Sequence, residues 1–434
     1  MVARENSRRD ESARDVGVNR RQFFKTVAVL SGAAAAGSLM PSCMPGGAPA
    51  SKGPVTVKFW KSPHHEKEAD FWVPIIKQFE DAHPNIKIEF SVLPWYEAGA
   101  RLTTAFASGN PPDVLYVVDA WGPKYIESKY FMDFDAAGYS KEVKDQFDAQ
   151  LFAKVPNYLG KTYGIPFLGV PRFLYVNNKM LKDAGVSAPT TWDEFTKVGT
   201  STTKGDKWGY VVFKPGYWQA FWPWLWMAGA DIMNPEGTKA AFNTPEGVNA
   251  LQFFVDWWRK YKMLPDYGSY DQEQAEDLFY RQGVAMESGH NIMADRLPKE
   301  WPDVDFDVVM MPKGPAGAFS FADFGYVTIS QACQYKDEAW QWVKFITSKD
   351  GAGAYLKNVG LFPARPDISI MEKNKAWPVY VNNMEKIRGA PMHPHFEEAN
   401  NRMWAQIEAA ILGQVTPKEA FATAEGDFNQ ALAG

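Results

Sequence analysis

Strand-like and helix-like patterns of apolar residues alternate through the first third of the chain. Residues 55–59 alternate between apolar and polar side chains, which is typical of a strand. Apolar residues then recur at helical spacing over 71–79, and residues 86–92 alternate again. A second helix is predicted up to Ser108, and the continuous apolar run 113–118 favours a strand buried on both faces. This order predicts right-handed βαβ units and a mostly parallel sheet.

The rest of the chain continues the mixture of strands and helices, which predicts an α/β fold without internal repeats. Further strand patterns lie at 173–177, 208–213, 284–286, 306–310 and 326–330. Helix starts are indicated by Thr191 with Glu194, Thr244 before Pro245, and Thr416 with Glu419. The paired Trp257 and Trp258 fit the core face of a helix.

The N-terminal segment carries the features of an export signal. Arg20 and Arg21 precede an apolar, Ala-rich stretch from Val27 to Leu39, which is too short to span a membrane stably. Pro41, Ser42 and Cys43 follow. This order resembles a bacterial twin-arginine signal joined to a lipoprotein cleavage box. Residues 1–42 are therefore expected to be a signal peptide, Cys43 the lipidated residue, and 43–53 a flexible tether.

Such a chain is expected to be lipid-anchored on the outer face of the bacterial cytoplasmic membrane, in a periplasm or at a cell surface. Removing a segment of net charge +3 takes the formal charge from −5 to −8. With no cluster of Lys or Arg beyond the signal, this acidic balance argues against nucleic acid as a partner. If Cys43 carries the lipid, Cys333 is alone and no internal disulfide forms.

The sequence contains no complete catalytic or metal-binding motif that we identify. The pair His65-Glu66 begins a zinc-protease pattern, but Ala69 stands where its second His would be. No Walker loop, nucleophile elbow or dinucleotide fingerprint is present. His393 and His395 have no evident further ligands. We expect no catalytic residues, no metal and no cofactor, although a pair of glycosidase carboxylates is not ruled out by spacing alone.

Several segments, in order and at matching spacing from about residue 54 onward, resemble family 1 extracellular solute-binding proteins of bacterial ABC importers, the group that includes maltose-binding protein. The segments are 55–60, 79–88, 102–114, 163–166, 175–181, 189–195, 283–286 and 360–365. The resemblance implies a type II periplasmic-binding-protein fold, with two α/β lobes, a hinge, and a ligand cleft between the lobes. No chemistry on the ligand is implied.

By the same resemblance, the first lobe spans 54–164 plus 312–360 and the second spans 165–311 plus 361–434. The chain is expected to cross between lobes near residues 164–166, 311–312 and 362–364. Extended, Pro-marked segments of this kind suit a hinge.

Candidate ligand-binding residues are aromatic side chains for stacking on sugar rings, and charged or backbone groups for the hydroxyls. In the first lobe they follow predicted strand ends or begin a helix, and they are Trp60, His64, Glu66, Trp95, Tyr96, Asp119 and Trp121. Near the predicted crossings and in the second lobe they are Arg172, Trp218, Trp222, Glu287, Gly289, His290, Phe324, Gly325 and Arg365. For each residue a structural role is the alternative, such as core packing for the Trp residues of 218–226, or ion pairs that fix the hinge for the two Arg residues.

The function expected from these features is capture of a di- or oligosaccharide and its delivery to a membrane permease by a monomeric binding protein. The high content of Trp, with 17 residues, favours sugar. One alternative keeps the fold and changes the ligand to a polyamine, a metal chelate or a phosphorylated polyol. Another is an extracellular glycan-active enzyme, which also needs aromatic subsites and carboxylates.

Overall fold

The computed structural model describes residues 53–155, 157–214, 217–369 and 373–434. The predicted signal peptide, Cys43 and the tether up to residue 52 lie outside the described residues. In the described ranges, no helix has the length and apolar character needed to cross a bilayer.

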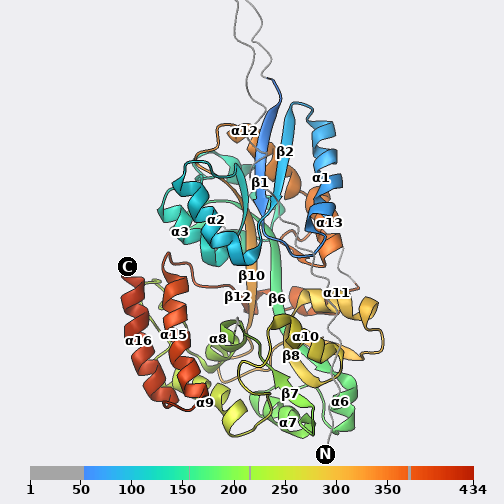
Figure 1. Cartoon of the computed structure of the whole chain (residues 1–434), viewed down its shortest axis with the longest axis vertical. Helices are drawn as coiled ribbons and strands as arrows, with labels where there is room; N and C mark the ends of the chain where they lie inside the picture. Colours follow the sequence, from blue (N-terminus) through green and yellow to red (C-terminus); the bar gives the residue numbers. More distant parts are fainter. Residues whose placement is uncertain (1–52, 156, 215–216, 370–372) are drawn as a thin grey trace, which may run out of the picture. The chain divides into compact units, whose positions relative to one another are not determined.

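The strands and helices occur in an α/β order (Figure 1). The strands are β1 (Val55–Lys61), β2 (Ile86–Val92), β3 (Val114–Val118), β4 (Asn157–Tyr158), β5 (Lys161–Thr162), β6 (Ile165–Asn177), β7 (Trp208–Val211), β8 (Val284–His290), β9 (Phe306–Val309), β10 (Ser320–Ile329), β11 (Phe362–Pro363) and β12 (Ile387–Arg388). The helices are α1 (Glu68–Ala82), α2 (Trp95–Ala107), α3 (Gly122–Glu127), α4 (Tyr139–Val143), α5 (Ala149–Lys154), α6 (Asn178–Asp183), α7 (Trp192–Thr202), α8 (Tyr217–Ala228), α9 (Pro245–Arg259), α10 (Gln272–Tyr280), α11 (Asn291–Glu300), α12 (Lys336–Ile346), α13 (Lys349–Val359), α14 (Ala376–Val381), α15 (Phe396–Ile411) and α16 (Pro417–Leu432).

One sheet, ten-stranded in the described residues, runs through the molecule in the order β2-β1-β3-β10-β6-β8-β7, with β9 and β11 also pairing with β6 and β12 pairing with β10. The first part of β6 pairs with β10, and its last residues pair with β8 and β9. The strands β6 and β10 therefore connect two groups of elements, which we call the first lobe (around β1–β3) and the second lobe (around β7–β9) (Figure 1).

The strand directions correct the prediction of a mostly parallel sheet. β1 is parallel to β2 and β3, and β7 is parallel to β8, as βαβ units require. In the centre, however, β10 runs antiparallel to both β3 and β6, and β6 runs antiparallel to β8. The cause is connectivity, because β6 leads from the first lobe to the second and β10 leads back.

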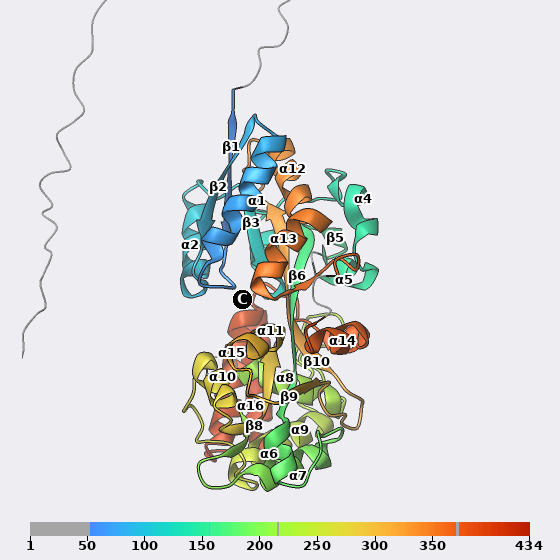
Figure 2. The same cartoon turned by 90° about the vertical axis from the view of Figure 1, so that its right-hand side faces the viewer.

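Each lobe has an aromatic core built from segments far apart in the sequence. In the first lobe, Trp72 of α1 is fully buried, with its ring 5.2 Å from Phe59 and 4.8 Å from Tyr355 of α13. Figure 2 shows α12 and α13 beside α1. In the second lobe, Trp224 of α8 lies 4.9 Å from Trp257 of α9, and both rings are fully buried. Each such ring contributes about 1.5–3 kcal/mol through burial.

The capping residues fix helix starts largely as predicted. Thr416 accepts from the Glu419 amide, and Glu419 accepts from the Thr416 amide at 2.9 Å, which confirms the capping box. Thr191 accepts from the amide of Glu194, but the Glu194 carboxylate accepts from the amide and hydroxyl of Thr190 at 2.7 and 2.6 Å. The carboxylate therefore reaches one residue further back than a capping box requires.

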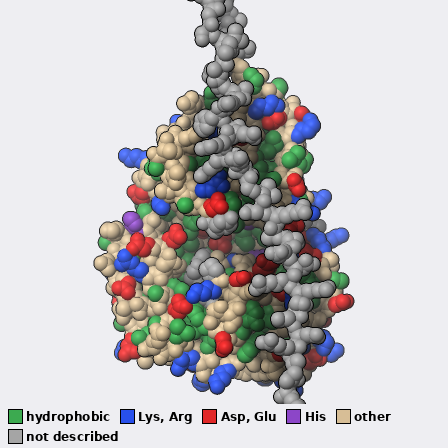
Figure 3. All heavy atoms as spheres, viewed as in Figure 1, with side chains coloured by type: hydrophobic (Ala, Val, Ile, Leu, Met, Phe, Trp, Pro, Cys, Tyr) green, Lys and Arg blue, Asp and Glu red, His purple; other side chains and the backbone are tan. Residues whose placement is uncertain are grey.

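Several strands are longer than their apolar patterns predicted. The expected strand 173–177 begins at Ile165, and the expected strand 55–59 extends to Lys61. The expected strand 284–286 extends to His290, and the expected strand 326–330 begins at Ser320. Between the predicted crossing at 311–312 and β10, the Lys313 and Ala316 amides donate to the Thr190 and Met227 carbonyls, both in the second lobe. On the face drawn in Figure 3, Lys and Arg side chains are interspersed with Asp and Glu, outside the grey atoms.

Candidate functional site

The two crossing strands present two faces, and each face meets different side chains of the lobes. Asp323 of β10 pairs with Val170 of β6, and Phe324 pairs with Gly169, so adjacent residues point to opposite faces. Arg172 lies two residues after Val170 and therefore shares the face of Asp323. We refer to the Asp323 face and the Phe324 face below.

Aromatic side chains from the strand ends of the first lobe gather on the Asp323 face. A Cβ atom at Gly325 would meet the ring of Tyr116, so Tyr116 covers this face. The ring of His64, after β1, lies 5.4 Å from Tyr116 and 5.4 Å from Trp95, each edge to face. Trp95 in turn lies 5.6 Å from Trp121. These rings sit at the carboxyl ends of strands, which is where open α/β sheets bind ligands.

A buried ion pair supports this surface from inside the first lobe. Lys61, the last residue of β1, lies 2.7 Å from Glu68 at the start of α1, and both side chains are at most 2% exposed. Glu68 also accepts from the Trp72 indole at 2.9 Å and the Tyr355 hydroxyl at 2.9 Å. The pair ties β1, α1 and α13 together beneath His64.

Charged side chains of the second lobe approach the same face from β8 and α10. Arg172 is paired with His290 across β6 and β8, and His290 Nε2 lies 2.9 Å from Glu276 Oε1. Burial opposes the ionisation of Glu276, but His290 lowers its pKa to about 2. Burial, and then the charge of Glu276, raise the pKa of Glu287 well above its ordinary value. These effects favour the protonated carboxyl group of Glu287, and the charge of Arg172 opposes them.

Several buried polar atoms on this side have no hydrogen-bond partner among the described residues. They are Nε and Nη1 of Arg172, Oε2 of Glu287 and Nδ1 of His290. The nearest ionic contact of Arg172 is Asp323, with Nη2 and Oδ2 3.9 Å apart. Burial lowers the pKa of Arg172, while Asp323 opposes that shift. Buried donors and acceptors without partners are costly, so these atoms are candidates for hydrogen bonds with a ligand.

Arg365, the other arginine predicted from sequence, has a different environment. Its Nε and Nη2 donate to the two carboxylate oxygens of Asp367 at 2.9 and 2.8 Å, and Nη1 donates to Gln146 at 2.6 Å. Its guanidinium group also lies 5.4 Å from the centre of the Phe147 ring. Arg365 therefore resembles the predicted alternative, an ion pair near the hinge.

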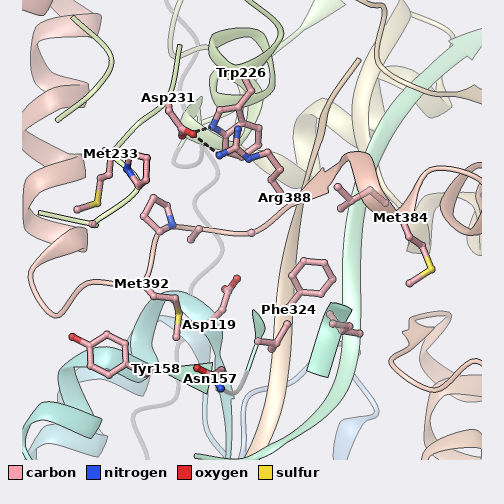
Figure 4. Close-up of a pocket in the computed structure, with 18 of the residues that line it drawn as sticks. Asp119, Asn157, Tyr158, Trp226, Asp231, Met233, Phe324, Met384, Arg388 and Met392 are labelled. Carbon is pink, nitrogen blue, oxygen red and sulfur yellow. Dashed lines mark hydrogen bonds and ion pairs between the residues drawn. The ribbon is translucent and has the colours of Figure 1, made fainter. Parts of the chain in front are cut away.

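A cavity of about 570 Å³ lies on the Phe324 face (Figure 4). Its lining comes from both lobes, and includes the predicted residues Asp119 and Phe324 with Asp148, Tyr158, Trp226, Asp231, Glu236, Tyr380, Arg388 and Met392. Asp119 is buried, accepts from the Ala120 amide at 2.9 Å and points into the cavity. Burial, and then Asp323, raise the pKa of Asp119 well above its ordinary value.

Three lining residues form a preorganised cluster at the second-lobe end of the cavity. Asp231 accepts from the Trp226 indole at 3.1 Å and from Arg388 at 2.5 Å (Figure 4). The Arg388 guanidinium lies 4.5 Å from the centre of the Trp226 ring, within the range of a cation–π contact. Within the cluster, Asp231 engages the Trp226 indole and one nitrogen atom of Arg388, which fixes both side chains.

The other predicted residues lie in varied places. The guanidinium of Arg101 covers the Trp60 ring at 5.5 Å, and Glu66 is exposed. Trp222 is 1% exposed and packs against Phe321 and Phe396. Side chains that lie outside the described residues are those of Tyr96 and Trp218. A Cβ atom at Gly289 would meet Met293 and Tyr175, so close packing requires glycine there.

Sequence reasoning missed the residues whose role depends on partners distant along the chain. They are Lys61, Glu68, Tyr116, Glu276, Tyr355, Trp226, Asp231 and Arg388. Lys61 and Glu68 carry one weak signal, because a charged residue at the end of an apolar strand precedes an opposite charge at a helix start. Within the described ranges, no group of three or more His, Cys, Asp or Glu side chains is placed to hold a metal ion.

Two known proteins match most of this chain in sequence. A putative binding protein of Brucella abortus (strain 2308) is 26% identical over 395 residues, covering 85% of this chain and 92% of that protein. The diacetylchitobiose binding protein DasA of Streptomyces coelicolor is 24% identical over 380 residues, covering 84% and 87%.

A solved structure shares the fold. An ABC substrate-binding protein from Listeria monocytogenes, in complex with cycloalternan, superposes with a TM-score of 0.77 at 19% identity, covering 88% of this chain and 99% of that one. The family model described as bacterial extracellular solute-binding protein matches residues 62–353. The chain therefore belongs to this family, the substrate-binding proteins of ABC transporters.

Proposed function

We propose that this protein captures a carbohydrate of di- or oligosaccharide size on the Asp323 face and delivers it to the permease of an ABC importer. The observation that carries the proposal is the set of buried, unpartnered polar atoms of Arg172, Glu287 and His290. They lie near the aromatic rings of the first lobe, since a charge on His290 lowers the pKa of His64. Rings and unpaired donors together match the flat C–H faces and hydroxyl rims of sugars.

Lobe closure follows from the way the site is divided. His64, Trp95 and Trp121 belong to the first lobe, while Glu287 and His290 belong to the second. A ligand that contacts both sets binds the closed form better and shifts the open–closed equilibrium toward it. The lobe ranges 54–164 plus 312–360 and 165–311 plus 361–434 belong to this proposal, with β6 and β10 as the hinge strands.

The names of relatives support the carbohydrate class. DasA is a diacetylchitobiose binding protein, and the Listeria protein was solved with cycloalternan. Among the predicted ligand contacts, we propose that Trp60, Trp95, Trp121 and the segment of Trp218 supply stacking surfaces. Asp119 lies near both faces, because it lines the cavity and interacts with Asp323.

A thermal-unfolding screen tests the carbohydrate proposal. Residues 44–434 would be heated with mono-, di- and oligosaccharides, polyols, polyamines and phosphorylated polyols. A ligand of the folded state at 100 times its dissociation constant adds about 2.7 kcal/mol of stability, so the midpoint should rise by a few degrees with one related set of sugars. A response only to polyamines or phosphorylated polyols would keep the fold and refute the carbohydrate class.

We further propose that Cys43 carries a lipid that holds the protein on the outer face of the membrane. The sequence around Cys43 is typical of a site at which the signal peptide is cleaved and the following cysteine is lipid-modified. In the bacterial host, Cys43→Ser should move the protein from the membrane fraction to the soluble exported fraction, measured by immunoblotting. Ser51→Thr, in the predicted tether, is the matched control. Membrane association that survives Cys43→Ser would refute the anchor.

A further inference from the structure

The ammonium group of Lys61 determines the protonation state of His64. Lys61 Nζ lies 2.8 Å from the Ser62 carbonyl, 2.7 Å from Glu68 Oε1 and 2.9 Å from His64 Nδ1. An ammonium group has three N–H donors and no acceptor, so each hydrogen has one of these atoms as its acceptor. Nδ1 of His64 must therefore carry a lone pair, which makes His64 a neutral imidazole with its proton on Nε2.

The rest of the His64 residue is held by the same ion pair. The His64 amide donates to Glu68 Oε2 at 3.0 Å. The Tyr355 hydroxyl, 3.4 Å from Nδ1, has a shorter contact with Glu68 Oε1 at 2.9 Å. Backbone, tautomer and ring orientation of His64 thus depend on two buried charges beneath it.

The Nε2 side of the ring faces the proposed ligand site. Its one contact among the described residues is the Tyr116 hydroxyl, at the long distance of 3.5 Å. Trp95 lies at the ring edge, and the charge of His290 acts on His64 from the second lobe. The Nε2–H group of His64 therefore has only a long contact, with Tyr116, in the described residues, and it lies near the ring of Trp95.

We propose that Lys61 is a positioning residue, which keeps His64 neutral with its proton on Nε2 so that His64 donates a hydrogen bond to an acceptor oxygen of the carbohydrate. The inference rests on the proposed function. The ligand atom that accepts this hydrogen bond is then a hydroxyl, ring or glycosidic oxygen. Below about pH 8, where Lys61 is an ammonium group, His64 presents the same donor to the ligand.

The charged and titratable groups around His64 affect its pKa. Burial lowers the pKa of His64 well below its ordinary value, and the positive charges of Lys61 and His290 lower it further. Glu68, Tyr116 and Tyr355 also face the ring, but Glu68 is engaged by Lys61. Because the folded pKa lies below the unfolded value, the His64 contribution to stability is present above about pH 6.5 and is lost as pH falls.

The first test is nitrogen NMR of the histidine rings, which needs no ligand. Wild-type His64 should show a protonated Nε2 and should not titrate between pH 8 and pH 5.5. In Lys61→Met, the pKa of His64 should rise above its wild-type value, because the positive charge of Lys61 is lost and the Glu68 carboxylate stays beside the ring, while burial continues to lower the pKa. Lys58→Met, on the same strand, is the control and should behave as wild type. A wild-type ring with its proton on Nδ1, or one that titrates in this range, overturns the inference.

The second test uses the sugar that gives the largest response in the thermal screen. Lys61→Met should weaken its binding about tenfold at pH 7, where Lys61 is charged; this is the value of one hydrogen bond of about 1.4 kcal/mol. His64→Leu should weaken binding to the same extent, and adding His64→Gln to Lys61→Met should restore it, because a glutamine amide donates without a tautomer. Lys61→Met with Glu68→Gln repeats the test without an uncompensated buried carboxylate.

Unchanged binding in His64→Leu overturns the role of His64 as a donor to the ligand. If the NMR result holds and no sugar in the panel binds, the proposed function fails, while the control of His64 by Lys61 stands.

Discussion

Replacing Arg172 with Met is expected to weaken carbohydrate binding by about two orders of magnitude or more. Truncating one member of a buried, hydrogen-bonded charged group costs about 2–5 kcal/mol of binding free energy, and 2.7 kcal/mol is a factor of 100. Arg172 is 5% exposed and keeps two nitrogen atoms without partners in the described residues. A ligand that satisfies them loses those bonds in the variant. Isothermal titration calorimetry with the responding sugar measures the change.

Arg365→Met provides a matched control for this experiment. Arg365 is similarly buried at 8% exposure, but its donors are engaged by Asp367 and Gln146. Its loss should lower stability and leave the affinity within about threefold of wild type, since rim or remote charges contribute little to binding. Equal losses of affinity in the two variants would show that Arg172 acts through hinge structure and not through the ligand.

Replacing Glu68 with Leu is expected to lower the free energy of unfolding by about 3–5 kcal/mol. The change leaves the Lys61 ammonium group buried without a counter-charge, which is the costly way to break a buried ion pair. It also removes the acceptor of the Trp72 and Tyr355 donors. Urea titration followed by tryptophan fluorescence measures the loss.

The pH dependence of that loss identifies Lys61 as its cause. Burial lowers the pKa of Lys61 to about 8, with Glu68 opposing the shift. Without Glu68 this pKa falls further, while the unfolded lysine keeps its ordinary value. The folded variant therefore releases its proton at a lower pH than the wild type. The difference in the free energy of unfolding between the wild type and Glu68→Leu should therefore become smaller as pH rises toward about 8, and it should stay constant above that pH.

An exposed ion pair on the same helix is the control. Lys77 and Asp81 of α1 are 2.6 Å apart, with side chains 72% and 65% exposed. Asp81→Asn should change stability by less than about 1 kcal/mol at every pH, because solvent screens such pairs. If the loss of stability in Glu68→Leu did not depend on pH, it would be due to packing and not to the charge of Lys61.

The sequence predicted most elements whose signals are local. Apolar spacing located α1, and the capping residues located the starts of α7, α9 and α16. Strand ends were underestimated in β8 and β10, where polar or small residues such as Glu287, Ser288 and Asp323 continue the strand. Polar residues of this kind interrupt the apolar pattern from which the strands were predicted.

The environment of each candidate residue depends on contacts that no local pattern encodes. Arg172 and Arg365 had equal status in the sequence, but Arg365 is engaged by Asp367, two residues away, and by Gln146, which is 219 residues away. The pairing of Asp231 with Arg388 spans 157 residues. Trp222 belongs to the most aromatic segment of the chain, yet Phe321 and Phe396 surround it. Tertiary packing decided each case.

The place of β10 in the sheet has a consequence for synthesis of the protein. β10 lies between β3 and β6, so the sheet of the first lobe is incomplete until residue Ile329 has left the ribosome. Until then β3 and β6 keep unpaired edges, which are templates for association with other chains. Late insertion of a central strand is also a slow, long-range folding step. A nascent chain of this protein therefore exposes these strand edges until translation has passed β10.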